Sequence, residues 1–258
     1  MKMKPACTYN PGEMAGKEWI DLMHSKGFKA MEIAYTMLPD NEKDDIVNYA
    51  KSSGFSLSIH SPYGKNNITD SDTENREKSL AQAKEAIDFA ANHDLRVVTL
   101  HPGRMSPDDN SPEEKWELLL KVVAEIAEYA KEKKVKIGLE NMELRPFELV
   151  YTIDDLNRFA KFGIDNPYFG VTLDFAHFSS HNILKPDLSK LKLPVHNVHL
   201  SQGKDKKMHF PLTVEGGMVD LKSVCEVLKE YDYDGFVVFE TREQYPESRD
   251  VFVNAMEK

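Results

Sequence analysis

The chain has 258 residues, of which 41% are hydrophobic and 29% charged, a size and balance typical of a soluble globular protein with one large domain or two small ones. Only two cysteines occur, Cys7 and Cys225, which excludes a disulfide framework and a cysteine-based zinc site. The net charge of −10 argues against non-specific binding to a phosphate backbone, which requires clustered lysine and arginine.

Short apolar runs alternate with amphipathic stretches along the whole chain. The apolar runs predict eight strands, at 4–8, 29–34, 55–60, 96–101, 136–141, 168–174, 195–200 and 235–240. The amphipathic stretches predict helices at 17–26, 43–53, 75–92, 113–132, 153–162 and 221–230, with a weaker segment after Pro186 and a short tail after Pro246. This alternation implies parallel strands joined by helices. Eight units of roughly 30 residues predict an α/β fold, a single (β/α)8 TIM barrel over residues 1–258.

The ends of six successive predicted strands carry residues of one chemical kind. In a barrel of this type the catalytic groups lie at the C-terminal strand ends, which here carry His60, His101, Glu140, Asp174, His199 and Glu240. Three carboxylates and three imidazoles that converge on one mouth need a cation to offset their desolvation. This donor set suits Zn²⁺, Mn²⁺, Fe²⁺ or Co²⁺ better than Mg²⁺ or Ca²⁺. The sequence therefore predicts a divalent metal centre.

Two further histidines follow these strands and add to the predicted metal ligands. His177 comes three residues after Asp174, in the loop that we expect after the sixth strand, and His209 lies in the long loop after the seventh. His196 comes three residues before His199, so in an extended strand the two side chains face opposite ways. We therefore expect His196 to pack against a helix, away from the metal centre.

Seven short motifs resemble, in order, those of the xylose isomerase-like TIM-barrel superfamily. They are HSPY at 60–63, HPG at 101–103, GLEN at 138–141, LDFAH at 173–177, VHLS at 198–201, HFPL followed by EGG between 209 and 217, and FET at 239–241. This superfamily contains the endonuclease IV type of abasic-site nucleases and many isomerases or epimerases of sugars and sugar phosphates. The resemblance spans most of the chain and implies one to three divalent ions, with zinc or manganese preferred.

The endonuclease IV type holds three zinc ions, and the resemblance implies which residues would bind them here. The first two sites would share Glu140, with His60 and His101 on one side and Asp174, His199 and Glu240 on the other. The third would use His177 and His209.

The third site departs from the nuclease pattern. The nucleases have an aspartate two residues before the second histidine, and this chain has Lys207 there. Asp205 would have to reach in to replace the missing ligand. His177 is therefore also a candidate for binding a group of the substrate.

We interpret the chain first as a divalent-metal sugar or sugar-phosphate isomerase or epimerase. Such an enzyme removes a proton next to a carbonyl and returns it elsewhere, through an enediolate that the metal stabilises. The resemblance implies that Glu140 and Glu240 act as the acid/base pair from opposite sides of the substrate. Candidate substrate contacts are Tyr63, Arg104, His177 and Arg242.

The alternative is a zinc-dependent abasic-site endonuclease, and DNA is a partner only under that alternative. Three departures disfavour it: HLSQ replaces a usual His-x-Asn-Asp, Phe175 and Ala176 replace a usual Thr or Ser and Cys, and the early loops offer no arginine for penetrating DNA. A metal-binding barrel without catalysis is a third interpretation.

The expected partner is otherwise a small-molecule sugar or sugar phosphate, and the sequence leaves a homo-oligomer open. No apolar run reaches the about 18 residues of a membrane span, and no secretory signal is visible at the start. We therefore expect a cytoplasmic protein with no membrane contact.

Overall fold

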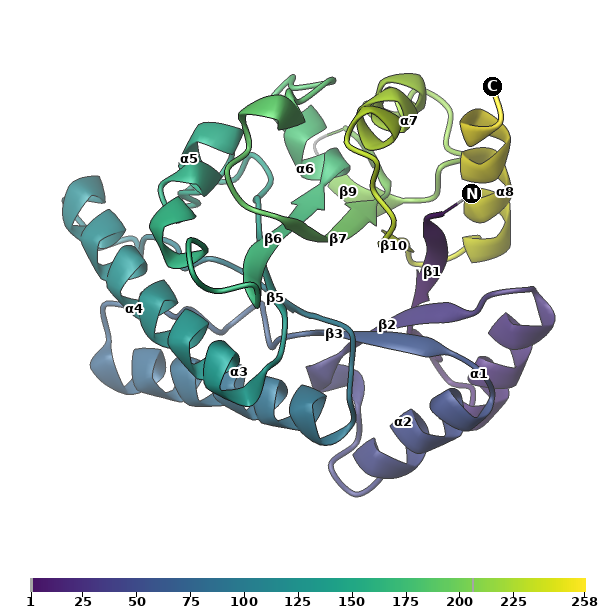
Figure 1. Cartoon of the computed structure of the whole chain (residues 1–258), viewed down its shortest axis with the longest axis horizontal. Helices are drawn as coiled ribbons and strands as arrows, with labels where there is room; N and C mark the ends of the chain where they lie inside the picture. The colour runs from purple at the N-terminus through teal and green to yellow at the C-terminus, as the bar shows by residue number, and fades with distance from the viewer. Residues whose placement is uncertain (1, 206) are drawn as a thin grey trace.

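The computed structural model describes residues 2–205 and 207–258 and confirms the predicted (β/α)8 barrel (Figure 1). Eight parallel strands close in the order β1, β10, β7, β6, β5, β4, β3, β2. Their bounds lie within two residues of the predicted ones: β1 Lys4–Thr8, β2 Ala30–Ala34, β3 Ser56–His60, β4 Val98–Leu100, β5 Ile137–Glu140, β6 Phe169–Asp174, β7 Val195–Leu200 and β10 Phe236–Phe239. All strands run the same way, so their C-terminal ends form one mouth.

Helices surround the barrel and bury their apolar faces against it (Figure 1). They are α1 Gly16–Ser25, α2 Lys43–Ser52, α3 Thr73–Asn92, α4 Pro112–Lys133, α5 Ile153–Asn157, α6 Phe175–Ser180, α7 Leu221–Glu230 and α8 Tyr245–Met256, with short 3₁₀ turns η1 Tyr35–Met37, η2 Ala160–Phe162 and η3 Leu188–Lys190. Within the described ranges, none of these helices combines the length and the apolar character needed to cross a membrane.

Two of the predicted helices have the wrong length. The predicted helix 153–162 is broken into α5 and η2, because the N–H groups of Arg158, Phe159 and Phe162 donate to carbonyls three residues back, which tightens the backbone. The predicted short tail is the 12-residue helix α8, which Pro246 starts and the fully buried Phe252 anchors.

Two short elements near the mouth were not predicted. His177 lies in α6, a helix of six residues that follows β6 without a loop. His209 lies in a hairpin of β8 (Gln202–Lys204) and β9 (Lys207–Phe210), inside the segment that we expected to be a loop. These elements are too short to give a periodic hydrophobic pattern.

The interior of the barrel is layered. Apolar side chains fill one end: Ala6, Ala30, Phe236 and Val238. A buried polar layer follows, in which Thr99 and Thr172 hydrogen-bond to each other (3.2 Å) and Asn197 donates to Thr99 (3.1 Å). Gly138 leaves room for this layer, since a Cβ there would lie 2.3 Å from the Thr172 hydroxyl. Side chains two residues further along these strands reach the mouth.

His196 contacts residues of β5 and β6 away from the mouth, and its expected packing against a helix stays a prediction. It is buried, its Nδ1 lies 2.9 Å from the carbonyl oxygen of Ile137, and a Cβ on Gly170 would lie 2.8 Å from its ring. Burial lowers the pKa of His196 to about 4, whereas an unfolded histidine has a pKa of about 6.5. Between these values the unfolded chain binds a proton that the folded chain excludes, so stability falls as the pH drops below about 6.5.

We therefore expect His196 to make the protein acid-sensitive. Lowering the pH from about 7.5 to about 5 should cost about 2 kcal/mol of unfolding free energy through this group alone. His196→Gln keeps a donor for Ile137 but does not titrate, so it should lose about 2 kcal/mol less than the parent over the same range. Urea unfolding of both proteins at the two pH values measures the difference. Equal losses would show that His196 is not the group responsible.

Candidate metal centre

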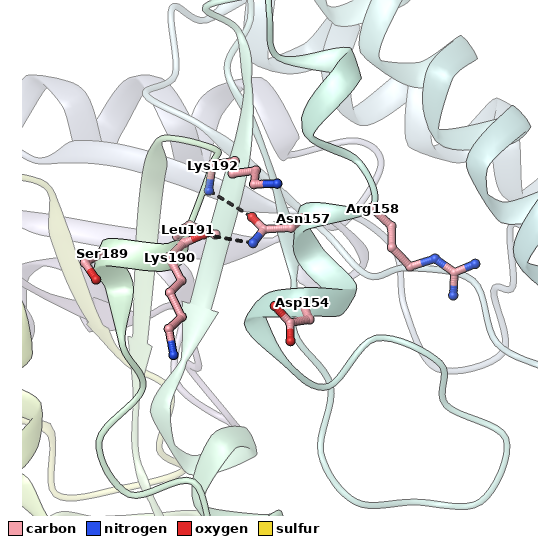
Figure 2. A pocket seen from close by; sticks show the side chains of 7 residues that line it. All are labelled: Asp154, Asn157, Arg158, Ser189, Lys190, Leu191 and Lys192. Atoms are coloured by element: carbon pink, nitrogen blue, oxygen red, sulfur yellow. Dashed lines mark hydrogen bonds between the residues drawn. The ribbon is translucent and has the colours of Figure 1, made fainter.

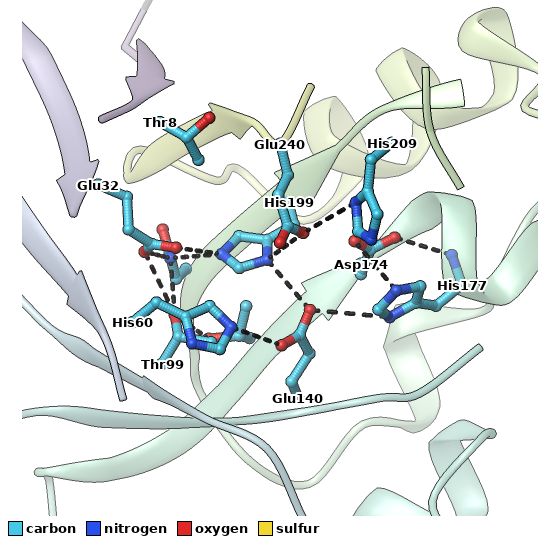
Figure 3. A network of polar contacts seen from close by, with 12 residues as sticks. Thr8, Glu32, His60, Thr99, Glu140, Asp174, His177, His199, His209 and Glu240 are labelled. Carbon is cyan, nitrogen blue, oxygen red and sulfur yellow. Dashed lines mark hydrogen bonds and ion pairs between the residues drawn. The ribbon is translucent and has the colours of Figure 1, made fainter. Parts of the chain in front are cut away.

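Glu140 joins two groups of potential metal ligands at the mouth (Figure 3). Its carboxylate is completely buried at the end of β5. Oε2 lies 3.2 Å from His101 Nε2 and 3.5 Å from His60 Nε2, whereas Oε1 lies 3.0 Å from His199 Nδ1. Each oxygen therefore faces a different group of histidines.

The larger group is made of Glu140, Asp174, His199 and Glu240, which offer ligand atoms within 4.8 Å of one another. Glu240 Oε2 lies 3.2 Å from His199 Nδ1. In the described part of the chain, Glu140 Oε2, Asp174 Oδ2 and Glu240 Oε2 are buried and accept no hydrogen bond. Buried carboxylate oxygens without donors are costly unless a cation binds them. With one imidazole, this donor set fits a divalent transition-metal ion.

Asp174 divides its two oxygens between the backbone and this group. Oδ1 accepts a hydrogen bond from the N–H of His177 (2.8 Å) and so caps α6, while Oδ2 faces the other ligands. Asn141 holds the backbone of Asp174, accepting from its N–H (2.8 Å) and donating to its carbonyl (3.0 Å). The short helix therefore fixes the orientation of Asp174.

His177 is oriented by the same turn of chain. Its Nδ1 lies 2.8 Å from the carbonyl oxygen of Asn141, a partner that requires Nδ1 to carry the proton. In the neutral ring Nε2 is then left with a lone pair, and this buried atom has no hydrogen-bond partner among the described residues. It lies 3.8 Å from Asp174 Oδ2. Such a nitrogen can bind a cation or accept a hydrogen bond from a substrate hydroxyl.

A third group of potential metal ligands contains His177, and its carboxylate is Glu143 and not an aspartate near position 207. His177, His209 and Glu143 offer ligand atoms within 4.8 Å of one another. Asp205, which would have had to reach in for the third site to form, does not do so: it lies exposed at the turn between β8 and β9, and Lys207 is exposed as well. The loop after β5 supplies Glu143 in place of that aspartate. Its Oε1 also pairs with Arg145 Nη2 at 2.7 Å.

Glu32 is a buried residue of the site that the sequence reasoning missed. It lies in the middle of β2 and is 1% exposed. Its Oε1 lies 2.8 Å from His199 Nε2, and its Oε2 accepts hydrogen bonds from Asn197 (2.7 Å) and Ser58 (2.9 Å). This contact places the Nε2 proton of His199 toward Glu32 and leaves Nδ1 to face the metal-ligand group. A lone carboxylate in the apolar run AMEIA was the available signal.

Burial and close contact between carboxylates and imidazoles shift the pKa values of the residues in this site. Burial raises the pKa of Asp174 to about 6, although the nearby His177 works against it. Burial disfavours the charged form of His177, but Asp174 and Glu140 outweigh it and raise the pKa of His177 to about 9. Burial likewise opposes ionisation of Glu240, yet His209 and His199 hold its pKa well below the usual range. The carboxylates thus require positive charge beside them, which a metal ion would also supply.

A cavity of about 740 Å³ opens above these groups. All four predicted substrate contacts line it, namely Tyr63, Arg104, His177 and Arg242. Glu148 also lines it, and burial raises the pKa of this carboxyl to about 7 against the opposing charge of Arg104. The volume lies within the range of small-molecule sites.

A second cleft lies on the outer surface between α5 and the segment after η3 (Figure 2). Asn157 crosses it, donating to the carbonyl of Lys190 (2.9 Å) and accepting from the N–H of Lys192 (2.8 Å). These bonds tie two segments together and use both ends of the amide. The cleft contains none of the predicted site residues.

The fold and site define a class of protein: a (β/α)8 barrel with histidine, aspartate and glutamate gathered where its strands end. The family of xylose isomerase-like TIM barrels matches residues 20–256, so the chain belongs to that family. It is 24% identical over 227 residues to the uncharacterized protein MJ1188 of Methanocaldococcus jannaschii, which covers 84% of this chain and 80% of that protein.

Solved structures share the fold over nearly the whole chain. A D-tagatose 3-epimerase-like protein has a TM-score of 0.85 and 22% identity, covering 99% of this chain and 97% of that one. The IOLI protein, whose crystal structure contains a zinc atom, has a TM-score of 0.76 and 18% identity, covering 99% and 98%. At these identities the likeness establishes the fold.

Proposed function

We propose that the protein is a divalent-metal-dependent isomerase or epimerase of a small sugar. The observation that carries this proposal is the group of Glu140, Asp174, His199 and Glu240, whose three carboxylates each have a buried oxygen without a hydrogen-bond partner. Glu240 of this group lines a sugar-sized cavity. The D-tagatose 3-epimerase-like neighbour supports the substrate class, and the zinc atom in the crystal structure of the IOLI protein supports a metal ion in a barrel of this fold.

The four residues would hold one divalent ion. When bound, such an ion polarises a sugar carbonyl and offsets the negative charge that develops when a proton leaves the neighbouring carbon. Zinc and manganese both suit two or more carboxylates with an imidazole. His60 and His101 could hold a second ion with the other oxygen of Glu140.

Glu140 and Glu240 are the proposed proton carriers. Burial opposes ionisation of both, but His199 and His101 keep the pKa of Glu140 well below its ordinary value, and His209 and His199 do the same for Glu240. Both carboxylates are therefore ionised at neutral pH and can accept a proton. One takes the proton from the carbon beside the carbonyl and can return it to the neighbouring carbon of the enediolate, which completes an isomerisation. In an epimerisation the other carboxylate first takes up a proton from solvent and then delivers it to the opposite face, while the first releases its proton to solvent.

The remaining contacts orient the substrate. Tyr63 is half-exposed at the cavity, and its ring centroid lies 4.9 Å from that of His60. Because the pKa of His177 is raised to about 9, its Nε2 carries a proton at neutral pH in the metal-free site and can donate a hydrogen bond to a sugar oxygen. Arg104 and Arg242 provide donors at the outer part of the cavity.

A second candidate function is metal-dependent hydrolysis of DNA at abasic sites. The third group of Glu143, His177 and His209 favours it, because it provides ligands for an additional ion. Incubating the zinc-loaded protein with a duplex that contains one abasic site tests this candidate directly. Strand cleavage that chelation abolishes would replace the isomerase proposal, and an intact duplex would eliminate the nuclease.

Metal removal should affect activity and stability together. We expect chelation to abolish conversion of ketoses and Zn²⁺ or Mn²⁺ to restore it. A metal ion present at 1,000 times its dissociation constant stabilises a fold by about 4 kcal/mol, which for this chain length raises the melting temperature by roughly 10 °C. Calorimetry with and without metal, alongside a ketose conversion assay and elemental analysis, measures both effects. A verified metal-loaded protein that converts no ketose would refute the proposed function.

A further inference from the structure

Lys115 is a buried cation that the proposed chemistry does not use. Of the lysines and arginines in the described part of the chain, it is the one that is buried, with 5% of its surface exposed. It is the fourth residue of α4 and is not among the residues that line the cavity above the metal centre. A lysine is almost never buried completely unless it is paired, so its partners indicate its role.

Three acceptors take the three protons of this ammonium group. Nζ donates to the carbonyl oxygen of Thr69 (2.7 Å) and to the hydroxyl of Ser71 (3.0 Å), both in the loop after β3 (61–72). It also pairs with Asp109 Oδ2 at 2.7 Å, in the loop after β4 (101–111). Because an ammonium has three donors, none is left over. Lys115 therefore joins the start of α4 to both loops.

Packing alone does not explain a lysine at this position. The charge lies near the N-terminus of α4, where the helix dipole disfavours a cation. Partial burial opposes ionisation of Asp109, although Lys115 and Ser71 hold its pKa below the ordinary value. Apolar residues of similar volume can often replace a buried ion pair without loss of stability. The lysine is therefore better explained by the geometry that its three bonds impose on the loops.

The same two loops are bonded to each other through Thr69 and Asn67. The hydroxyl of the fully buried Thr69 donates to the carbonyl oxygen of Arg104 (2.9 Å). Asn67 accepts from the N–H of Arg104 (3.0 Å) and donates to the same carbonyl (3.0 Å). A Cβ on Gly103 would lie 2.1 Å from the Thr69 hydroxyl oxygen, so the two loops can approach this closely only at a glycine. Thr69, which Lys115 binds by its carbonyl, thus fixes the backbone of Gly103 and Arg104.

The two loops supply four residues to the lining of the cavity: Tyr63, Gly64, His101 and Arg104. The guanidinium of Arg104 donates to the carbonyl of Gly64 (2.8 Å). The ring centroids of Tyr63 and His101 lie 5.5 Å apart. His101 Nε2 lies 3.2 Å from Glu140 Oε2. A displacement of the loops would therefore change the distance between an imidazole and a proposed proton carrier.

We propose that Lys115 is a positioning residue, which keeps the loops after β3 and β4 in the arrangement that places His101 against Glu140 and Arg104 beside the cavity. The inference rests on the proposed function and adds to it a residue that lies outside both the groups of potential metal ligands and the cavity. Its effect reaches the reacting atoms only through the polar contacts of the two loops.

The first test separates positioning from stability. Lys115→Met leaves Asp109 without its cation, whereas Lys115→Met combined with Asp109→Asn removes both charges, and both variants leave the carbonyl of Thr69 without the ammonium. On the ketose that the metal-loaded parent converts fastest, we expect kcat/KM to fall about 100-fold in both, the effect of misplacing a catalytic group by about 1 Å. The urea midpoint should drop in the single variant and recover in the double variant. Lys121→Met, on the exposed side of the same helix, is the matched control and should behave like the parent.

The second test measures the geometry and needs no turnover. Crystal structures of the metal-free parent and the double variant are compared. In the variant, the distance of 3.2 Å from His101 Nε2 to Glu140 Oε2 should lengthen by about 1 Å. The distance of 3.0 Å from His199 Nδ1 to Glu140 Oε1 should not change, because β7 and β5 carry these two residues. Two unchanged distances would overturn the inference.

The outcomes separate the two proposals. If the parent converts no ketose, the proposed function fails, and the crystal structures alone decide the role of Lys115. If the double variant regains activity together with stability, Lys115 is a structural residue, so the inference is overturned while the proposed function stands. Loss of folding in both variants would overturn the inference in the same way.

Discussion

Replacing Glu140 by glutamine is expected to lower kcat/KM on the sugar substrate by about 10³- to 10⁴-fold. The carboxylate is completely buried, faces His60 and His101 with one oxygen and His199 with the other, and is a proposed proton carrier. Glutamine has the same shape but cannot accept a proton, and its amide places a donor where a metal ion or an imidazole proton requires an acceptor. The substitution therefore removes a base and disrupts both groups of ligands.

Steady-state kinetics and elemental analysis of the purified Glu140→Gln protein measure the two effects. Glu77→Gln, on the exposed side of α3, is the matched control and should behave like the parent. Circular dichroism establishes that the variant is folded. A folded Glu140→Gln protein within tenfold of the parent activity would remove Glu140 from both proposed roles.

The second large effect concerns Glu32. Glu32→Leu should lower the unfolding free energy by about 3–5 kcal/mol, the usual cost of removing one partner from a buried charged pair. The substitution leaves donors of Ser58, Asn197 and His199 without their acceptor inside the barrel. The isosteric Glu32→Gln should fold but bind metal roughly 10- to 100-fold more weakly, because it no longer fixes the orientation and charge of His199.

Urea unfolding and competition with a metal-binding dye distinguish these two effects. An exposed glutamate of α4, Glu117, provides the control, and Glu117→Gln should change neither quantity. A purely structural Glu32 would lower stability in both variants and leave the metal affinity of folded Glu32→Gln at the parent value.

The sequence was sufficient to predict the barrel and the residues around its mouth. The eight strands are continuous apolar runs because both faces of a parallel sheet are buried. Once the strands are parallel and closed, the residues that end them must converge, so His60 and Glu240 come together although they are far apart in the chain. Their functional roles stay predictions, since the geometry brings donors together without identifying what they bind.

The features that could not be predicted depend on how loops fold. Glu143 approaches His177 only because of the path of the loop after β5, and no periodic pattern specifies that path. His209 has a positive φ of 67°, a conformation that sequence patterns do not predict for histidine. Glu32 was missed for another reason: it ends no strand, and only the closed barrel brings it to His199.

The capping of α6 by Asp174 explains which acidic residue stands at which strand end. An aspartate side chain is short enough to accept from the backbone N–H groups of a helix that starts beside it, and glutamate is not among the preferred capping residues. β6 runs directly into a helix and ends in aspartate, whereas irregular chain follows Glu140 and Glu240 after β5 and β10. Asp174 is one methylene shorter than Glu140 and Glu240, and this difference follows from whether a helix begins directly after the strand. The choice between aspartate and glutamate at these strand ends therefore does not indicate which metal ion the site would bind.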